Sequence, residues 1–189
     1  MMLRIIEWAP ITWSDKIPPF GEELKKHLER TNLGSKSYAV WNLLYQVLLQ
    51  HGIAPGCVSF TSGGKPYFAE EHVFFSLSHT ASVCAVSVAD VPTGIDVEKA
   101  DRQIPERVLR KIFSPEEYEQ YKADPVTGWC RKEAASKISG RGILADSGIS
   151  TALSGEIQFQ DMLVHEGEER YLISGGFQVS LNNTEYHIL

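Results

Sequence analysis

The sequence predicts an α+β fold made of two similar halves, and three observations lead to this prediction. Stretches in which apolar residues recur at helical spacing alternate with short runs of β-branched and aromatic residues. The order of helices followed by strands occurs before residue 92 and again after it. The chain has 189 residues and 43% hydrophobic content, enough for one compact domain or for two small halves packed together. We therefore expect one half at residues 1–91 and another at residues 92–189.

The first half is predicted to contain a strand, two helices and several short strands. Residues 1–8 are expected to form the strand. The helices cover residues 20–30 and 35–50, with Ser35 as a cap and Gly52 as a stop for the second. The short strands are expected at residues 58–61, 67–69, 73–76 and 83–89, and alternation predicts that the last is half-buried.

The second half is predicted to begin with a strand at residues 95–98. Three helices follow, and Ser114 caps the second of them, since a proline and two glutamates come directly after it. The third helix covers about residues 126–139 and ends at Gly140 or Gly142. The first helix is expected at residues 106–112, and strands at 156–160, 171–174, 177–181 and 185–188.

Composition argues against several classes of protein. A formal net charge of −6 disfavours broad nucleic-acid binding, which needs a basic surface. No apolar run is long enough to cross a bilayer, and the first residues lack the features of a secretory signal, so we expect a cytoplasmic protein. Cys57, Cys84 and Cys130 are isolated from one another, which argues against disulfides and against a zinc site.

Two carboxylates fall on one face of the strand at residues 95–98. Strand alternation points Asp96 and Glu98 the same way, where two unpaired charges would repel each other. Either both face water, or pair with Lys99 and Arg102, or they share a divalent cation. Magnesium prefers such oxygen ligands, so a magnesium site is the second interpretation.

A third carboxylate lies on the helix at residues 126–139. Trp129, Glu133 and Lys137 are four residues apart and share one helical face. Glu133 and Lys137 could simply form a surface ion pair, with Trp129 in the core. A carboxylate and a lysine on one face are also what a magnesium–phosphate site requires, because metal and lysine together neutralise a phosphate.

Two further features could contact a ligand. Ser78 and His79 come directly after an apolar strand and could donate hydrogen bonds to a phosphate. They could also be a hydrolase nucleophile and its base, although a Gly-x-Ser-x-Gly elbow is missing. Ser62-Gly63-Gly64-Lys65-Pro66 is a turn that lacks the spacing of a P-loop, and its glycines would let a ligand approach the backbone.

These features occur in a characteristic order, which is Gly64-Lys65-Pro66, Phe75-Ser76-Leu77-Ser78-His79, Gly94-Ile95-Asp96-Val97-Glu98, Phe113-Ser114 and Trp129-x-x-Lys132-Glu133-Ala134-x-x-Lys137-x-x-Gly140-x-Gly142. In order and spacing they resemble the 4′-phosphopantetheinyl transferase superfamily, in particular its longer, Sfp-like, pseudo-dimeric branch. The resemblance covers about Gly64 to Gly142. It implies two α+β halves in a pseudo-twofold arrangement, with coenzyme A bound between them.

The resemblance also implies an activity and a set of site residues. The enzyme would transfer 4′-phosphopantetheine from coenzyme A to a serine of an acyl or peptidyl carrier protein. Asp96, Glu98 and Glu133 would ligate magnesium, and Lys137 would contact and stabilise the phosphates. Glu133, directly or through a metal-bound water, is the expected base. Coenzyme A would contact Lys36, Gly64, Lys65, Pro66, Ser78 and His79.

The chain departs from the family at three places. Only Lys36 stands where family members carry an arginine-rich helix, Arg141 stands where lysine is common, and the C-terminal region is short. Apo carrier protein and coenzyme A are the expected partners of a monomeric protein. The alternative function is a non-catalytic module that binds coenzyme A or a nucleotide.

Overall fold

The structure is a computed structural model that describes residues 2–12, 18–31, 35–69 and 73–179. The strands in these residues are β1 (Arg4–Pro10), β2 (Val58–Phe60), β3 (Pro66–Phe68), β4 (Phe74–His79), β5 (Val83–Ala89), β6 (Thr93–Lys99), β7 (Ile157–Glu166) and β8 (Glu169–Gln178). The helices are α1 (Glu22–Thr31), α2 (Ser35–Gln50), α3 (Glu106–Ile112), α4 (Pro115–Tyr121), α5 (Pro125–Ser139) and the short 3-10 helix η1 (Thr151–Leu153). The predicted α+β class is confirmed.

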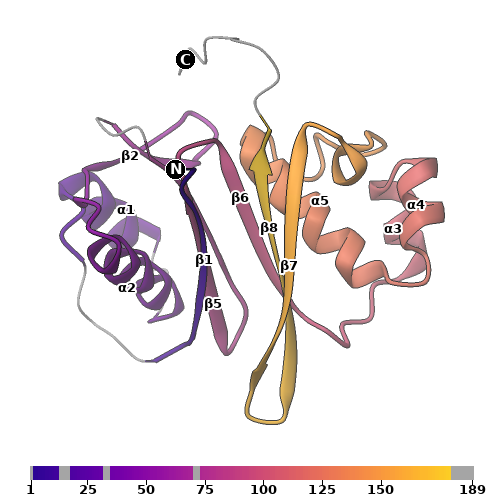
Figure 1. The fold of residues 1–189 in the computed structure, drawn as a ribbon, viewed down its shortest axis with the longest axis horizontal. Helices are drawn as coiled ribbons and strands as arrows, with labels where there is room; N and C mark the ends of the chain where they lie inside the picture. Colours follow the sequence, from indigo (N-terminus) through magenta and orange to yellow (C-terminus); the bar gives the residue numbers. More distant parts are fainter. Residues whose placement is uncertain (1, 13–17, 32–34, 70–72, 180–189) are drawn as a thin grey trace.

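Two three-stranded antiparallel sheets form the centre of the molecule. Their strand orders are β1-β5-β4 and β6-β8-β7. In both sheets the strand that comes last in the sequence, β5 or β8, is the central one, and the strand that comes first, β1 or β6, is at an edge. Figure 1 shows α1 and α2 on the outer side of the first sheet and α3, α4 and α5 on the other side of the molecule. The hairpin of β2 and β3 is a separate two-stranded sheet.

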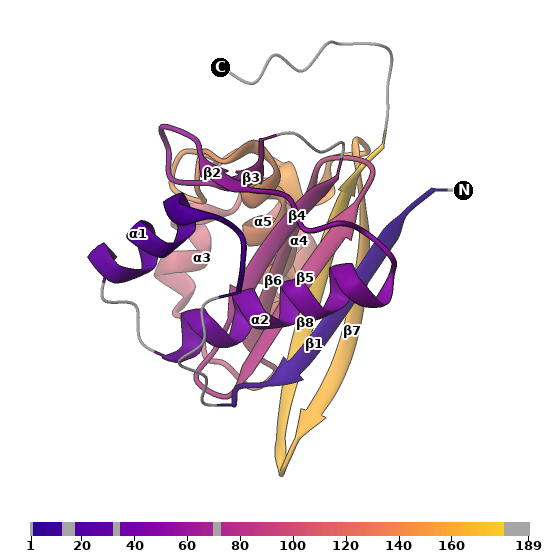
Figure 2. The same cartoon turned by 90° about the vertical axis from the view of Figure 1, so that its left-hand side faces the viewer.

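The cores lie on both sides of the first sheet. Figure 2 shows α2 crossing one face of this sheet, where its residues Trp41, Leu44 and Leu48 join a buried cluster. The opposite face packs against the second sheet, where Ile95 and Ile173 belong to a further buried cluster. Because β5 contributes to both clusters, all seven of its residues are buried, and the prediction of a half-buried strand was wrong.

The predicted helices agree with the structure in place and in order. Gly52, with a φ of +68°, follows the end of α2, and Gly140, with a φ of +72°, is the C-cap of α5. Ser114 caps α4 in a capping box, as the sequence predicts.

The strands of the second half depart from the prediction. The two strands expected at residues 171–174 and 177–181 are one continuous strand, β8, and β7 extends to Glu166. The strand expected at residues 185–188 lies outside the described residues.

The structure also bears on the expectations about membrane-spanning helices and about the cysteines. Within the described ranges, no helix combines the length and apolarity that crossing a membrane demands. All three cysteines are free thiols, of which Cys84 and Cys130 are buried and Cys57 is exposed.

Candidate functional site

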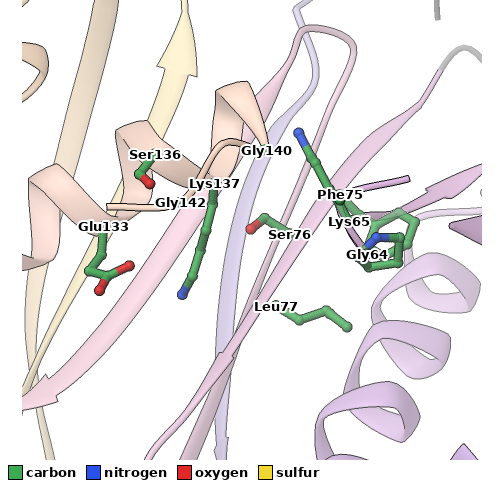
Figure 3. A pocket seen from close by; sticks show the side chains of 12 residues that line it. Gly64, Lys65, Phe75, Ser76, Leu77, Glu133, Ser136, Lys137, Gly140 and Gly142 are labelled. Carbon is green, nitrogen blue, oxygen red and sulfur yellow. The ribbon is translucent and has the colours of Figure 1, made fainter. Parts of the chain in front are cut away.

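A pocket of about 360 Å³ lies where the β2–β3 turn, β4 and α5 meet. Gly64, Lys65 and Pro66 line it from the turn, while Glu133 and Lys137 line it from α5. Figure 3 shows Gly64 and Lys65 on the wall opposite Glu133 and Lys137, with Ser76 between them. The remaining lining residues are Gly63, Phe75, Leu77, Ser136, Gly140 and Gly142. Residues from both predicted halves therefore share one cavity.

Helix α5 owes its place to caps at its ends and to close packing in its middle. Asp124 caps its first turn by accepting a hydrogen bond from the Thr127 N–H. Gly94 of β6 lies directly beneath it, because a Cβ at this position would stand 1.9 Å from the Ala134 carbonyl oxygen. Only glycine allows this approach, and the approach brings the helix face that carries Glu133 and Lys137 against β6.

Lys65 joins the β2–β3 turn to the end of α5. Its Nζ donates a hydrogen bond of 2.7 Å to the Ile138 carbonyl oxygen, one of the acceptors left without an intrahelical partner at the helix C-terminus. Burial lowers the pKa of the Lys65 ammonium from its usual value. This contact closes one side of the pocket.

Asp96 lies beside the pocket and is 6% exposed. Its Oδ1 accepts hydrogen bonds of 2.9 Å from Lys137 Nζ and from Ser78 Oγ. Its Oδ2 is buried and has no hydrogen-bond partner among the residues that the structure describes. Lys137 is therefore paired with Asp96, and it also donates to the Ile95 carbonyl oxygen at 2.8 Å, so the simple Glu133–Lys137 surface pair is not the arrangement found.

Glu98 and Glu133 are electrostatically coupled to Asp96. Burial and then the charge of Asp96 raise the pKa of Glu98, and the same two causes raise the pKa of Glu133. Glu98 forms an ion pair with Arg102, whose guanidinium lies 5.0 Å from the centre of the Trp129 ring. Arg102 thus balances Glu98, one of the pairings that the first interpretation of the sequence allowed. Lys99 does not pair with either carboxylate, because it forms an ion pair with Glu169.

The three carboxylates predicted to bind magnesium lie on two elements, Asp96 and Glu98 on β6 and Glu133 on α5. In the part of the chain that the structure describes, no three side chains of His, Cys, Asp or Glu are grouped so that they could hold a metal ion. Lys137 holds one oxygen of Asp96, and Arg102 holds one oxygen of Glu98. The metal assignment stays a prediction.

The remaining residues predicted to contact the ligand are Ser78, His79 and Lys36. Ser78 and His79 do not appear in the pocket lining, and Ser78 donates its hydroxyl hydrogen to Asp96. That hydrogen is therefore not directed at His79, which is exposed and has its Nδ1 3.3 Å from the Thr80 carbonyl oxygen. This geometry speaks against the hydrolase interpretation. The side chain of Lys36 lies outside the described residues.

A buried ion pair that the sequence did not predict lies next to the site. Lys132 and Glu117 are both fully buried and lie 2.6 Å apart. Lys132 also donates to the Ile149 carbonyl oxygen, and Glu117 accepts from the Ala152 N–H at 2.7 Å, so the pair ties α4 and η1 to α5. The capping box pointed to Glu117, but nothing in the sequence marked Lys132 as buried.

Comparison with known proteins identifies the domain that carries α5. The sequence model of the 4′-phosphopantetheinyl transferase superfamily matches residues 92–184, about half of the chain. This segment is therefore a domain of that superfamily, and it includes Asp96, Glu98, Glu133 and Lys137. No curated protein matches the chain.

Proposed function

We propose that this chain, with its 4′-phosphopantetheinyl transferase superfamily domain at residues 92–184, transfers 4′-phosphopantetheine from coenzyme A to a carrier protein. The acceptor is a serine of an acyl or peptidyl carrier protein. One observation supports this most strongly. The pocket joins Glu133 and Lys137 of the matched domain to the Gly64-Lys65-Pro66 turn, which lies outside it.

Coenzyme A occupies this pocket in the proposal. The exposed glycines at 63 and 64 carry no side chain, so the adenine can approach the backbone of the turn. Lys137, on the facing wall, meets the phosphates. A chain with similar halves at 1–91 and 92–189 would place the ligand between them, and the shared strand order of the two sheets supports this Sfp-like, pseudo-twofold arrangement.

Magnesium suits the carboxylates beside the pocket. Within the described ranges Asp96 Oδ2 is buried without a partner, and an unpaired buried carboxylate oxygen is costly unless a cation compensates it. Asp96 also raises the pKa of Glu98 and of Glu133, a repulsion that a shared cation would relieve. Asp96, Glu98 and Glu133 would hold the ion, which when bound would neutralise charge on the phosphates.

The reaction forms one bond and breaks one bond at phosphorus. The carrier serine oxygen attacks the β-phosphate of coenzyme A, and the bond to adenosine 3′,5′-bisphosphate breaks. Glu133 accepts the serine proton, a role that its raised pKa favours, because a carboxylate with a higher pKa is a stronger base. Lys137 stabilises negative charge that develops on the phosphoryl oxygens.

Intact-mass measurement of carrier proteins tests this proposal. The protein is incubated with coenzyme A, magnesium chloride and a panel of apo acyl and peptidyl carriers. We expect at least one carrier to gain the mass of a phosphopantetheinyl group on its serine. Coenzyme A binding with every carrier unmodified would favour the alternative, a non-catalytic binding module.

A further inference from the structure

Two serines join the edges of the two central sheets. Ser76 and Ser78 of β4 face β6, and their hydroxyl oxygens accept hydrogen bonds from the N–H groups of Ile95 at 3.2 Å and Val97 at 3.3 Å. Each hydroxyl therefore satisfies a backbone donor at the outer edge of β6, where no strand of the second sheet is paired. In this structural role the two serines are alike.

Ser78 differs from Ser76 because it also contacts a carboxylate of the proposed metal site. Its hydroxyl donates to Asp96 Oδ1 at 2.9 Å. A hydroxyl carries a single hydrogen, so Ser78 cannot donate to a phosphate while it holds Asp96. This commitment sets Ser78 apart from the phosphate-contacting role that its place beside His79 suggests.

The two oxygens of Asp96 stand in different surroundings. Oδ1 is held from two sides, by Ser78 on β4 and by Lys137 on α5, which fixes the rotation of the carboxylate. Oδ2 is buried and has no partner in the described part of the chain, which makes it the oxygen left free to bind a cation. A ligand carboxylate is commonly oriented by hydrogen bonds of this kind.

We infer that Ser78 is a positioning residue that holds Asp96 Oδ1 and so presents Oδ2 to the magnesium ion. The inference rests on the proposed function, because it requires a cation at Asp96. It assigns Ser78 to the metal side of the site. It also makes the metal site depend on both predicted halves, since Ser78 lies on β4 and Asp96 on β6.

The test compares Ser78→Ala, Ser78→Thr and the matched control Ser76→Ala. Ser76→Ala removes the same kind of bond to a β6 N–H but touches no carboxylate in the structure. The measurement is the dissociation constant of Mn²⁺, obtained by calorimetric titration of each protein without coenzyme A, so that the position of Ser76 in the pocket lining does not affect the comparison. We expect Ser78→Ala to weaken Mn²⁺ binding by about 10-fold or more, the usual effect of losing such an orienting partner. Ser76→Ala should stay near the wild type, and Ser78→Thr should recover most of the affinity because it keeps the hydroxyl.

Three results would contradict the positioning role of Ser78. Equal Mn²⁺ affinity of the wild type and Ser78→Ala would overturn the inference, as would equal losses in Ser76→Ala and Ser78→Ala, which would point to the sheet junction instead. Weaker coenzyme A binding by Ser78→Ala in the presence of a chelator would overturn it too, because it would reveal a phosphate contact. A wild-type protein that binds no Mn²⁺ and modifies no carrier would refute the proposed function itself.

Discussion

Replacing Gly94 by alanine tests whether the approach of α5 to β6 builds the site. The new Cβ would stand 1.9 Å from the Ala134 carbonyl oxygen, 2.9 Å from its carbon and 3.1 Å from the Ile138 nitrogen. All three are backbone atoms, so no side chain can rotate away. To lengthen the closest contact from 1.9 Å to 3.0 Å, α5 must move by roughly 1.1 Å.

A displacement of this size affects both stability and the site. Overpacking usually costs 1–3 kcal/mol, and a clash with backbone belongs at the upper end, so we expect a loss of about 3 kcal/mol in the free energy of unfolding. Lys137 lies one turn beyond Ala134, so its 2.9 Å bond to Asp96 should also be lost. Urea denaturation followed by circular dichroism measures the first effect, and Mn²⁺ affinity measures the second.

Gly155→Ala is the control for this experiment. A Cβ at Gly155 meets nothing within 4 Å, so this variant should stay within about 0.5 kcal/mol of the wild type. If Gly94→Ala were as stable as Gly155→Ala and kept its Mn²⁺ affinity, the close approach of α5 to β6 would not be what positions the carboxylates.

Two further predictions concern charged groups near α5. Lys132→Met leaves Glu117 buried without its cation, so we expect it to lower the free energy of unfolding by about 3–5 kcal/mol, whereas Arg110→Met, at an exposed pair, should cost less than about 1 kcal/mol. Similar losses in both variants in a urea titration would contradict the structural role of the buried pair. Burial raises the pKa of Glu133, so protonation of this group favours the folded state. That stabilisation is complete below the unfolded-state pKa and is lost as the pH rises through the folded-state pKa. Glu133→Gln should therefore melt at a higher temperature than the wild type at pH 7 with chelator present, and the difference should close as the medium becomes acidic. A difference that does not change with pH would argue against the raised pKa.

Much of the fold could be predicted from local sequence signals. Apolar spacing located α2, Gly140 and Gly142 marked the end of α5, and the serine-proline-glutamate sequence at Ser114 located the start of α4. The glycines of β8 misled the prediction, because Gly175 and Gly176 looked like a break between strands. They lie within one strand, where a Cβ would meet Ile6 at 2.4 Å and Ile157 at 3.1 Å, so close packing and not a turn requires them.

The candidate site was predictable in its residues but not in their partners. Spacing placed Glu133 and Lys137 on one face of α5, and both line the pocket. Sequence spacing carries no information on contacts between distant elements, so it could not show that Lys137 binds Asp96 or that Ser78 does so from β4. These pairings depend on how β6 lies between β4 and α5.

Carrier modification by the wild type and by Asp96→Asn tests the central claim most directly. Asparagine keeps the shape of the side chain but removes the charge that pairs with Lys137 and that would bind the metal. Intact mass spectrometry of an apo carrier, after incubation with coenzyme A and magnesium, should show the phosphopantetheinyl mass with the wild type and an unchanged carrier with Asp96→Asn. Full modification by Asp96→Asn would contradict the role of Asp96, and an unmodified carrier with the wild type across the whole panel would contradict the transferase function.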